Sequence, residues 1–530
     1  MPAGVSRVTW LLLLLFSCYA GIFIYRTSFL IDGVRYFSLF DDEMISMRYA
    51  RNLAQGYGLV WNPGGQRVEG YTNLGWVLFM ALVHLTRIQP SKISLVIQIA
   101  SAVCLLFNLV IVERIARLYT EGDRWATIVA VVMTAFYFPL VNWSLQGTEV
   151  GVLTLLIGLA AFNAVDEMRR DTWSLRPYLL MAAASLTRID FLVPFGALLA
   201  LRAIGQATDR RRHLLWGAGV WALAAVGQTA FRLAYYGDLV PNTYYLKVAG
   251  VAPTVRMARG FLMATQFAAG VHWLLFLIPY AAVAWRRDAE TRLLMGLFSV
   301  QVAYSIIVGG DAWENWGGSN RFITPVMPLF FVVFCAAVTR AARWLAQSQL
   351  AARLPAVRLL TAGPTVAAVL GICLVRFNGP HGIESLKQLA LIERPGHFTE
   401  SVKMVRSALT IQRISTREAT VAVVWAGTVP YFCERTAIDL LGKSDPVIAR
   451  SAPRIPAGLA GVGEFWPGHN KWDHDYSIGQ LKPDLVTELW RPLPPSQQEA
   501  YEWIQSDGGD LLARRGSPHL HWDSIKPVER

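Results

Sequence analysis

Long apolar runs separated by short, arginine-rich polar stretches dominate the first 376 residues. These runs lie at 9–24, 93–112, 125–143, 150–165, 174–187, 189–205, 213–235, 271–285, 292–308, 322–342 and 356–376. A perpendicular membrane span needs about 20 apolar residues, so the shorter runs require tilt or flanking polar residues. The pattern predicts eleven transmembrane helices. The first run lacks a small-residue cleavage site and is therefore expected to stay as an uncleaved helix.

A further apolar segment, residues 74–85, decides the orientation of everything that follows it. It is only 12 residues long, and counting it as a span would reverse all later helices. If it lies on the membrane surface instead, seventeen loop arginines fall on the same side of the membrane as the N-terminus. The positive-inside rule assigns that side to the cytoplasm. We therefore expect residues 74–85 to form a juxtamembrane helix on the outer leaflet, with the C-terminus outside.

Composition agrees with a membrane protein and excludes several other classes. Of the 530 residues, 54% are hydrophobic and 16% charged, and the mean hydropathy is +0.36, more apolar than a soluble core can absorb. The net charge of +12 is no sign of nucleic-acid binding, because basic DNA-binding domains are not built from long apolar runs. The five cysteines show no disulfide or metal spacing. Motifs for ATP, dinucleotides and serine hydrolases are also missing from the sequence.

Three polar segments lie on the outer side under this topology. They are the first outer loop at 26–92, a second loop at 236–270, and the tail at 377–530. The tail has strand-like runs at 419–425 and 485–489, and it is long enough for an extracytoplasmic α/β or α+β domain. We therefore divide the chain into a transmembrane domain, 1–376, and a C-terminal domain, 377–530. Trp425, Trp466, Trp472 and Trp490 of the tail form either a sugar platform or part of a buried core.

Two adjacent carboxylates begin the predicted helix of the first outer loop. Asp41 and Asp42 precede Ile45 and Tyr49, whose spacing is helical, and Gly56 is a plausible end of that helix. An Asp before a helix is a favoured cap, and acidic residues suit the positive end of a helix. A carboxylate beside a second one at a desolvated boundary also has its pKa raised towards that of a general base. A structural cap and a catalytic base both remain open at this point.

The loop at 56–76 is rich in glycine, asparagine and aromatic residues, which predicts a tightly turned segment. Tyr71 is available to stack on a sugar, although anchoring in the membrane interface is the commoner use of such rings. Asn62, Glu69 and Asn73 are candidates to hydrogen-bond sugar hydroxyls.

Charged and polar groups recur at the outer ends of later spans and in the second loop. They are Glu149, Arg188, Asn242, Lys247, Asp311 and Arg321. A charge at such depth costs ~2.5–3.5 kcal/mol on insertion scales, so it usually faces a partner or a cavity. The ordinary alternative is a boundary charge or an internal Arg188–Asp190 pair. Their convergence on one side fits a site in which Arg188, Arg321 or Lys247 binds a lipid phosphate, with acidic groups near the acceptor.

Several of these segments resemble the mycobacterial terminal arabinofuranosyltransferases of the AftB type, which are GT-C glycosyltransferases. The resemblance is carried by 41–53, 56–64, 68–73, 236–237, 241–243, 309–311, 321–322, 426–431, 438–442, 467–469 and Lys471. The first-loop segments are long and specific, whereas the later short ones carry little weight alone. The resemblance runs from the first span almost to the C-terminus.

This resemblance implies a polytopic α-helical membrane protein with the GT-C fold, about eleven transmembrane helices and an extracytoplasmic C-terminal domain. The implied activity is inverting transfer of a sugar, D-arabinofuranose, from a polyprenyl (decaprenyl) phosphate to a hydroxyl of a cell-envelope glycan or surface protein. Asp41 aligns with the family's base, and Asp42 tunes or replaces it. The other candidate site residues come from the polar positions described above: Arg188, Lys247 and Arg321 for the phosphate, and Asn62, Glu69, Tyr71, Asn73, Glu149, Asn242 and Asp311 for the sugar or acceptor.

The same logic requires no cofactor and no metal, although an ion bound by the acidic pair stays an open alternative. The expected location is the plasma membrane of a bacterium, with the site outside and the bilayer, donor and acceptor as partners. Two other functions compete with transfer. A transporter or flippase of a lipid-linked or anionic solute would line its pathway with these charges, but no inverted repeat is evident. A structural assembly subunit with a sugar-binding tail would leave Asp41 and Asp42 free to vary.

Overall fold

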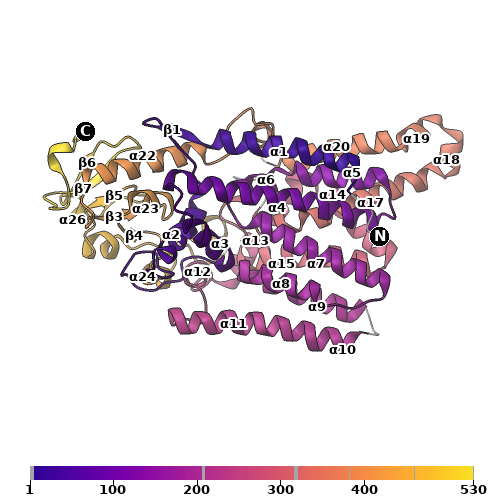
Figure 1. Ribbon diagram of the computed structural model, residues 1–530, viewed down its shortest axis with the longest axis horizontal. Helices are drawn as coiled ribbons and strands as arrows, with labels where there is room; N and C mark the ends of the chain where they lie inside the picture. The colour runs from indigo at the N-terminus through magenta and orange to yellow at the C-terminus, as the bar shows by residue number, and fades with distance from the viewer. Residues whose placement is uncertain (1–4, 206–208, 315–319, 381, 459, 529–530) are drawn as a thin grey trace.

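Helices aligned along one long axis form most of the molecule, and a small sheet domain lies at one end (Figure 1). The computed structural model describes residues 5–205, 209–314, 320–380, 382–458 and 460–528. Because apolar side chains cover the helices on several faces, the bundle has both a buried core and a large exposed apolar surface. That is the arrangement of a multi-pass membrane protein.

Six helical segments of the described chain are long and apolar enough to cross a membrane. They are α1 (Arg7–Thr27), α4 (Pro90–Tyr119), α7 (Val150–Arg170), the continuous stretch Arg210–Tyr236 that ends in α11 (Ala218–Tyr236), α15 (Ala289–Val308), and Thr324–Ala346 with α17 (Met327–Ala346). Three bent pairs raise the number to nine if each is one span. These are α5 (Arg124–Ala135) with α6 (Phe138–Leu145), α13 (Pro253–Val271) with α14 (Trp273–Arg286), and α20 (Gly363–Asn378) with α21 (Ile383–Leu389).

Nine of the eleven predicted spans therefore correspond to a long helix or a bent pair. The remaining two are α8 (Arg176–Thr187) and α9 (Leu192–Gly205), of 12 and 14 residues, joined by the 3₁₀ turn η1 (Ile189–Phe191). At 1.5 Å per residue they rise only about 18–21 Å, short of the ~30 Å hydrocarbon core. They pack against α7 and α15, and Arg188, directly before the turn between them, pairs with Glu149 at the start of α7.

Residues 253–270 of the predicted second outer loop are helical, which the sequence pattern did not indicate. They form α13, which meets α14 at an angle of 98°. Two arginines interrupt the apolar pattern there, but Arg259 is buried and donates to backbone carbonyls and to Glu314 at 3.4 Å. Because this charge is satisfied inside the protein, it does not prevent a helix in this position.

The first outer loop forms a compact unit at the end of the bundle. A hairpin of β1 (Phe29–Ile31) and β2 (Val34–Tyr36) precedes α2 (Asp41–Ala54), and α3 (Leu74–His84) packs on α2. The predicted helices at 41–53 and 74–85 are thus confirmed as helices. The position of α3 relative to a bilayer stays a prediction.

A five-stranded mixed sheet forms the centre of the C-terminal domain, in the order β4-β3-β5-β7-β6. The strands are β3 (Thr420–Val423), β4 (Thr436–Asp439), β5 (Leu485–Val486), β6 (Tyr501–Ile504) and β7 (Leu511–Arg514); β3 pairs parallel with β4 and β5, and the other pairs are antiparallel. Helix α22 (Phe398–Ile414) packs on α23 (Thr428–Cys433), and α23 contacts β3. One apolar cluster contains Val421 and Val423 of the sheet together with Met44 and Tyr49 of α2, so the domain shares its core with the first outer loop.

Short elements connect these parts. The helices are α10 (Arg210–Arg212), α12 (Asn242–Lys247), α18 (Gln349–Arg353), α19 (Pro355–Leu360), α24 (Pro446–Arg450), α25 (Ala460–Glu464) and α26 (Pro495–Gln498). The remaining elements are the π-helical segments η2 (His213–Gly217), which continues into α11, and η4 (Asp475–Gln480), and the 3₁₀ turns η3 (Thr324–Val326) and η5 (Trp522–Ser524).

Candidate functional site

The first turn of α2 presents three consecutive carboxylates, Asp41, Asp42 and Glu43, at the positive end of the helix. Successive side chains on a helix point about 100° apart, so the three face different surroundings. Asp41 and Glu43 are each 4% exposed. The sequence predicted the helix and its acidic start, and the structure shows which carboxylate faces which neighbour.

Asp42 points towards cations from two distant segments. Its Oδ2 accepts from Arg321 at 3.0 Å, and its Oδ1 is paired with Lys443. The Trp313 indole N–H lies 3.3 Å from the same carboxylate. Burial alone would raise the pKa of Asp42, but Lys443 and Arg321 outweigh it and hold this pKa well below its usual value. Asp42 is therefore ionised at neutral pH.

Asp41 turns the other way, into the interface with the C-terminal domain. Its carboxylate accepts from the backbone N–H of Thr428 at 2.7 Å and of Gly427 at 3.3 Å, at the start of α23. Burial raises the pKa of Asp41 to about 6, against the lowering effect of these N–H groups. A Cβ on Gly427 would lie 1.9 Å from the Asp41 carbonyl oxygen, so only glycine permits this approach.

A small polar cavity of 50 Å³, hereafter the Asp42 cavity, lies beside Asp42. It is lined by Asp42, Glu43, Ile45, Ser46, Gly70, Tyr71, Thr72, Asn73, Glu149, Arg188, Thr243, Lys247, Arg321 and Lys443. The lining comes from α2, the 70–73 loop, the start of α7, the α8–η1 junction, α12, the segment before η3 and the loop after β4. Seven of the twelve predicted site residues meet here.

Arg321 and Arg188 reach the Asp42 cavity already engaged by carboxylates. Arg321 forms a two-pronged pair with Asp311 through Nε–Oδ2 at 2.8 Å and Nη2–Oδ1 at 2.9 Å. Arg188 contacts Glu149 at 2.5 Å and Asp190 at 3.0 Å. The expected Arg188–Asp190 pair is thus present, and it does not remove Arg188 from the cavity lining.

Lys247 differs from these arginines. It lines the Asp42 cavity, and within the described ranges its ammonium group has no hydrogen bond or ion pair. Burial lowers the pKa of Lys247 to about 8, and the nearby Arg321 charge lowers it further, while Asp42 opposes both effects. The cavity therefore holds one cation available for an incoming anion.

Lys443 is a cavity residue that the sequence reasoning missed. Asp439 shapes its loop by accepting from the N–H groups of Leu441, Gly442 and Ser444 at 2.7–3.0 Å. The Asn242 amide also donates to the Lys443 carbonyl at 3.0 Å. A signal was present, because Lys443 directly follows the 438–442 segment that carries the family resemblance.

Asn73 joins two carboxylates that line the Asp42 cavity. Its Nδ2 donates to Glu43 at 3.0 Å and to Glu149 at 3.1 Å, and its Oδ1 accepts from Ser46 at 2.9 Å. Burial, together with the nearby Glu149 charge, raises the pKa of Glu43 well above its usual value. Glu43, which was not predicted as a site residue, therefore lines the cavity as the carboxyl group whose proton is held more tightly than usual.

Five predicted site residues do not line the cavity. Three of them bind elements that border the cavity. Asp41 accepts from the start of α23, Asn242 donates to the Lys443 loop, and Asp311 pairs with Arg321. Asn62 bonds to Arg48 at 2.7 Å and to the Ala437 backbone, and it borders a separate 230 Å³ cavity. Glu69 is buried in an ion pair with Arg232 of α11. Direct contact of a sugar with Asn62 or Glu69 stays a prediction with no support from this geometry.

The tail tryptophans form a half-buried cluster rather than a fully buried core. The Trp466 and Trp490 rings stack at 5.3 Å with an interplanar angle of 3°, and Trp425 packs on Trp313, which contacts Asp42. Trp472 instead lies against two arginine side chains. The cluster adjoins the site, and its role as a sugar platform stays a prediction.

Part of the chain is similar in sequence to known proteins. Residues 396–513 match a family model described as a domain of unknown function (DUF8728). A terminal β-(1→2)-arabinofuranosyltransferase of Mycobacterium tuberculosis is 29% identical over 221 residues, which are 39% of this chain and 35% of that protein. The match thus spans about a third of the length of that curated relative.

Two solved structures share the fold. ArnT from Cupriavidus metallidurans bound to undecaprenyl phosphate has 13% identity and a TM-score of 0.55, with 96% of this chain and 98% of that chain covered. AglB from Archaeoglobus fulgidus, in complex with an inhibitory peptide and a dolichol-phosphate, has 11% identity and a TM-score of 0.51, with 99% and 77% covered. The chain has the GT-C fold of these proteins, and the predicted fold class and AftB-like resemblance are confirmed.

Proposed function

We propose that the protein is a membrane glycosyltransferase that moves D-arabinofuranose from a polyprenyl phosphate to a hydroxyl group of a cell-envelope glycan or surface protein. One observation carries the proposal: an ionised carboxylate, Asp42, lines a buried cavity together with four cations from separate segments. Such a cavity provides a proton acceptor and a binding site for a departing phosphate side by side. Of the relatives described above, one is a terminal arabinofuranosyltransferase. The two solved structures contain undecaprenyl phosphate and a dolichol-phosphate.

In the proposed step, the acceptor hydroxyl oxygen attacks the anomeric carbon as the bond from that carbon to the phosphate oxygen breaks. The hydroxyl proton passes to Asp42, and the polyprenyl phosphate leaves with the bonding electron pair. Attack opposite the leaving group inverts the anomeric centre. No other reactant is needed for this balance. Among the described residues, no cluster of three His, Cys, Asp or Glu side chains is arranged to hold an ion.

The phosphate is proposed to bind first at Lys247, because its ammonium charge is available. Arg321 and Lys443 contact Asp42 in the empty cavity. Once an anion arrives, these two cations gain a second acceptor, and part of their interaction moves from Asp42 to the phosphate. Asp42 then becomes less strongly stabilised as an anion and a better base when the substrate is in place.

Asp42 is a better placed base than Asp41, the residue that aligns with the family's acid. Asp42 lines the cavity, whereas both oxygens of Asp41 accept backbone N–H groups of α23. A general base must lie within hydrogen-bond reach of the proton it removes. We therefore assign proton transfer to Asp42 and the positioning of α2 against the C-terminal domain to Asp41. Tyr71, Asn73 and Glu149 remain as contacts of the sugar or acceptor.

The proposed orientation places the Asp42 cavity outside the plasma membrane of a bacterium. Arg169, Arg286 and Arg343 lie in the last turns of α7, α14 and α17. For α7 and α17 this is the end opposite the cavity, because the cavity residues Glu149 and Arg321 precede these helices. The positive-inside rule assigns that end to the cytoplasm. A transporter or flippase has less support, because transporters place their binding site near the bilayer midplane, whereas these charges gather at one end of the bundle.

The direct test incubates purified protein with a panel of polyprenyl-phosphate sugars and a hydroxyl acceptor, with mass detection of the products. We expect one pentose to be added to the acceptor, with polyprenyl phosphate released in equal amount. Movement of lipid-linked sugar across proteoliposomes without any glycoside product would contradict the proposal and favour the flippase. Addition of a chelator in a parallel reaction measures any dependence on a divalent ion.

A further inference from the structure

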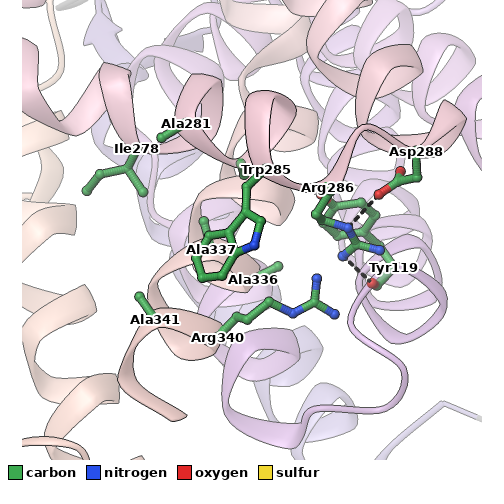
Figure 2. A pocket seen from close by; sticks show the side chains of 11 residues that line it. Tyr119, Ile278, Ala281, Trp285, Arg286, Asp288, Ala336, Ala337, Arg340 and Ala341 are labelled. Carbon is green, nitrogen blue, oxygen red and sulfur yellow. Dashed lines mark hydrogen bonds and ion pairs between the residues drawn. The ribbon is translucent and has the colours of Figure 1, made fainter. Parts of the chain in front are cut away.

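A second cavity lies at the opposite end of the helix bundle, between α14 and α17 next to Tyr119 at the end of α4 (Figure 2). Its volume is 560 Å³, and we name it the Arg340 cavity. It borders Asp288, directly before α15, whereas Asp311 lies three residues after α15 ends. A helix of 20 residues is about 30 Å long, so the two cavities are separated by roughly the thickness of a bilayer core.

Small side chains create the space. Five alanines line the facing surfaces of α14 and α17, where larger residues would fill the gap between the helices. Helix α14 is little buried, and it exposes Leu277, Tyr280 and Trp285. Trp285, which is 65% exposed, also lines the cavity. Exposed tryptophan beside arginine is typical of the level of lipid headgroups, so the cavity opens where a lipid can enter.

Two arginines but only one acidic residue, Asp288, line the Arg340 cavity. Arg286 is neutralised by Asp288 at 2.6 Å, and its guanidinium lies 4.5 Å over the Tyr119 ring (Figure 2). Arg340 is 42% exposed, and its ion pair with Glu121 is long, at 3.8 Å. Exposed pairs of this kind contribute little, and Arg340 keeps its capacity to donate to another anion. An apolar wall is therefore combined with one weakly engaged cation.

We propose that the Arg340 cavity binds an anionic phospholipid of the leaflet opposite the Asp42 cavity. The phosphate contacts Arg340, the glycerol region lies at Trp285, and an acyl chain packs on the alanine-lined wall. A free phosphate ion would make no use of that wall, and a zwitterionic lipid would gain less from the excess charge. This site does not depend on the proposed function, because its residues are remote from the Asp42 cavity.

Native mass spectrometry of the purified full-length protein tests the site, with phosphatidylglycerol and phosphatidylcholine of identical chains as the probes. We expect at least fivefold greater retention of phosphatidylglycerol by the parent protein. Arg340→Ala removes this preference, and Ala337→Leu lowers the retention of both lipids by narrowing the apolar wall. The matched control is Arg343→Ala on the same helix, whose partner Asp123 at 2.7 Å lies outside the cavity lining, and this variant keeps the preference.

Equal retention of the two lipids by the parent protein would overturn the proposal. So would an Arg343→Ala variant that loses the preference as fully as Arg340→Ala, because the effect would then be one of general surface charge. Displacement of bound phosphatidylglycerol by millimolar inorganic phosphate would identify a phosphate site rather than a lipid site, and would also contradict the proposal.

Discussion

The Asp42 cavity and the Arg340 cavity, at the two ends of the same bundle, both contain arginine and aspartate but differ in how these charges are held. In the Asp42 cavity, charged groups from several segments are buried and paired with one another. In the Arg340 cavity, the charges lie beside apolar walls and Arg340 is half-exposed. The Arg340 cavity is also about ten times larger, 560 Å³ against 50 Å³. The candidate active site is therefore identified by the buried charges that converge on the Asp42 cavity, and not by the volume of a cavity.

Burying charge is costly, which explains why the Asp42 cavity is built as a network. Removing an ion from water costs several kcal/mol, and only good geometry with further hydrogen bonds offsets this cost. The two-pronged Arg321–Asp311 pair and the Asn73 bridge provide such geometry. A network fixed in this way is pre-organised for charge that develops during a reaction. The Arg340 cavity has no comparable network among its lining residues, which fits binding rather than catalysis.

Arg321→Ala is expected to have the largest effect on binding. The substitution leaves Asp42 and Asp311 without a shared partner, and breaking a buried pair costs about 3–5 kcal/mol. The ratio kcat/KM should therefore fall by roughly 10²–10⁴-fold. Arg321→Lys should recover part of this loss, because it keeps the charge without the planar fork. If Arg321→Ala binds polyprenyl phosphate as tightly as the parent, the phosphate role is wrong.

Lys443→Met should weaken donor binding by about tenfold or more, because a hydrogen bond to a charged group contributes about 1.5–3 kcal/mol. Equilibrium binding of undecaprenyl phosphate measures the change. Lys526→Met is the matched control, since Lys526 is an exposed lysine of the same domain. A similar loss in both variants would show that general positive charge, and not the Lys443 loop, attracts the donor.

Gly427→Ala tests whether the Asp42 cavity depends on the docked C-terminal domain. The new Cβ would collide with the Asp41 backbone, and overpacking of this kind typically costs about 1–3 kcal/mol. We expect a melting temperature lowered by several degrees. We also expect lower turnover, because the ion pair between Lys443 and Asp42 would be displaced. Gly463→Ala, in a position with open space around it, serves as the control. Unchanged stability and turnover of Gly427→Ala would mean that the contact is dispensable.

The smallest expected effect is on the pH profile. Burial lowers the pKa of Lys247 to about 8, so its charge is present below pH 8 and is lost as the pH rises above it. KM for the donor should therefore increase several-fold between pH 7 and pH 9. Asp42 contributes nothing to this limb, because its pKa is held well below the usual value. Lys247→Arg should flatten the profile, and an identical alkaline limb in that variant would assign it to another group.

Much of the fold was predictable, because apolar periodicity and arginine placement are local signals. The helix at α2 and the strands β3 and β5 follow from such patterns. Helix α13 was missed, since Arg259 looks like a loop residue until Glu314 and the nearby backbone carbonyls are seen around it. A hydropathy profile scores Arg259 as an isolated charge, because the residues that pair with it are distant in the sequence.

The residue types of the candidate site were predictable from the sequence, but the neighbours that each side chain faces were not. Convergence of Glu149, Arg188 and Arg321 followed from the predicted topology. The division of roles between Asp41 and Asp42 did not, because it depends on where the start of α23 docks, more than 380 residues along the chain. Lys443 was missed for the same reason, since its contact with Asp42 joins residues 401 positions apart.

Turnover of Asp42→Asn and Asp41→Asn, measured side by side with a polyprenyl-phosphate arabinofuranose donor, tests the central claim most directly. Loss of a general base typically lowers the rate by about 10²–10⁴-fold. We expect that loss in kcat for Asp42→Asn, with donor binding retained. Asp41→Asn should lose less than about tenfold in kcat, together with thermal stability, because it weakens the contact with α23. Near-normal turnover of Asp42→Asn, with activity abolished in a folded Asp41→Asn protein, would contradict the account.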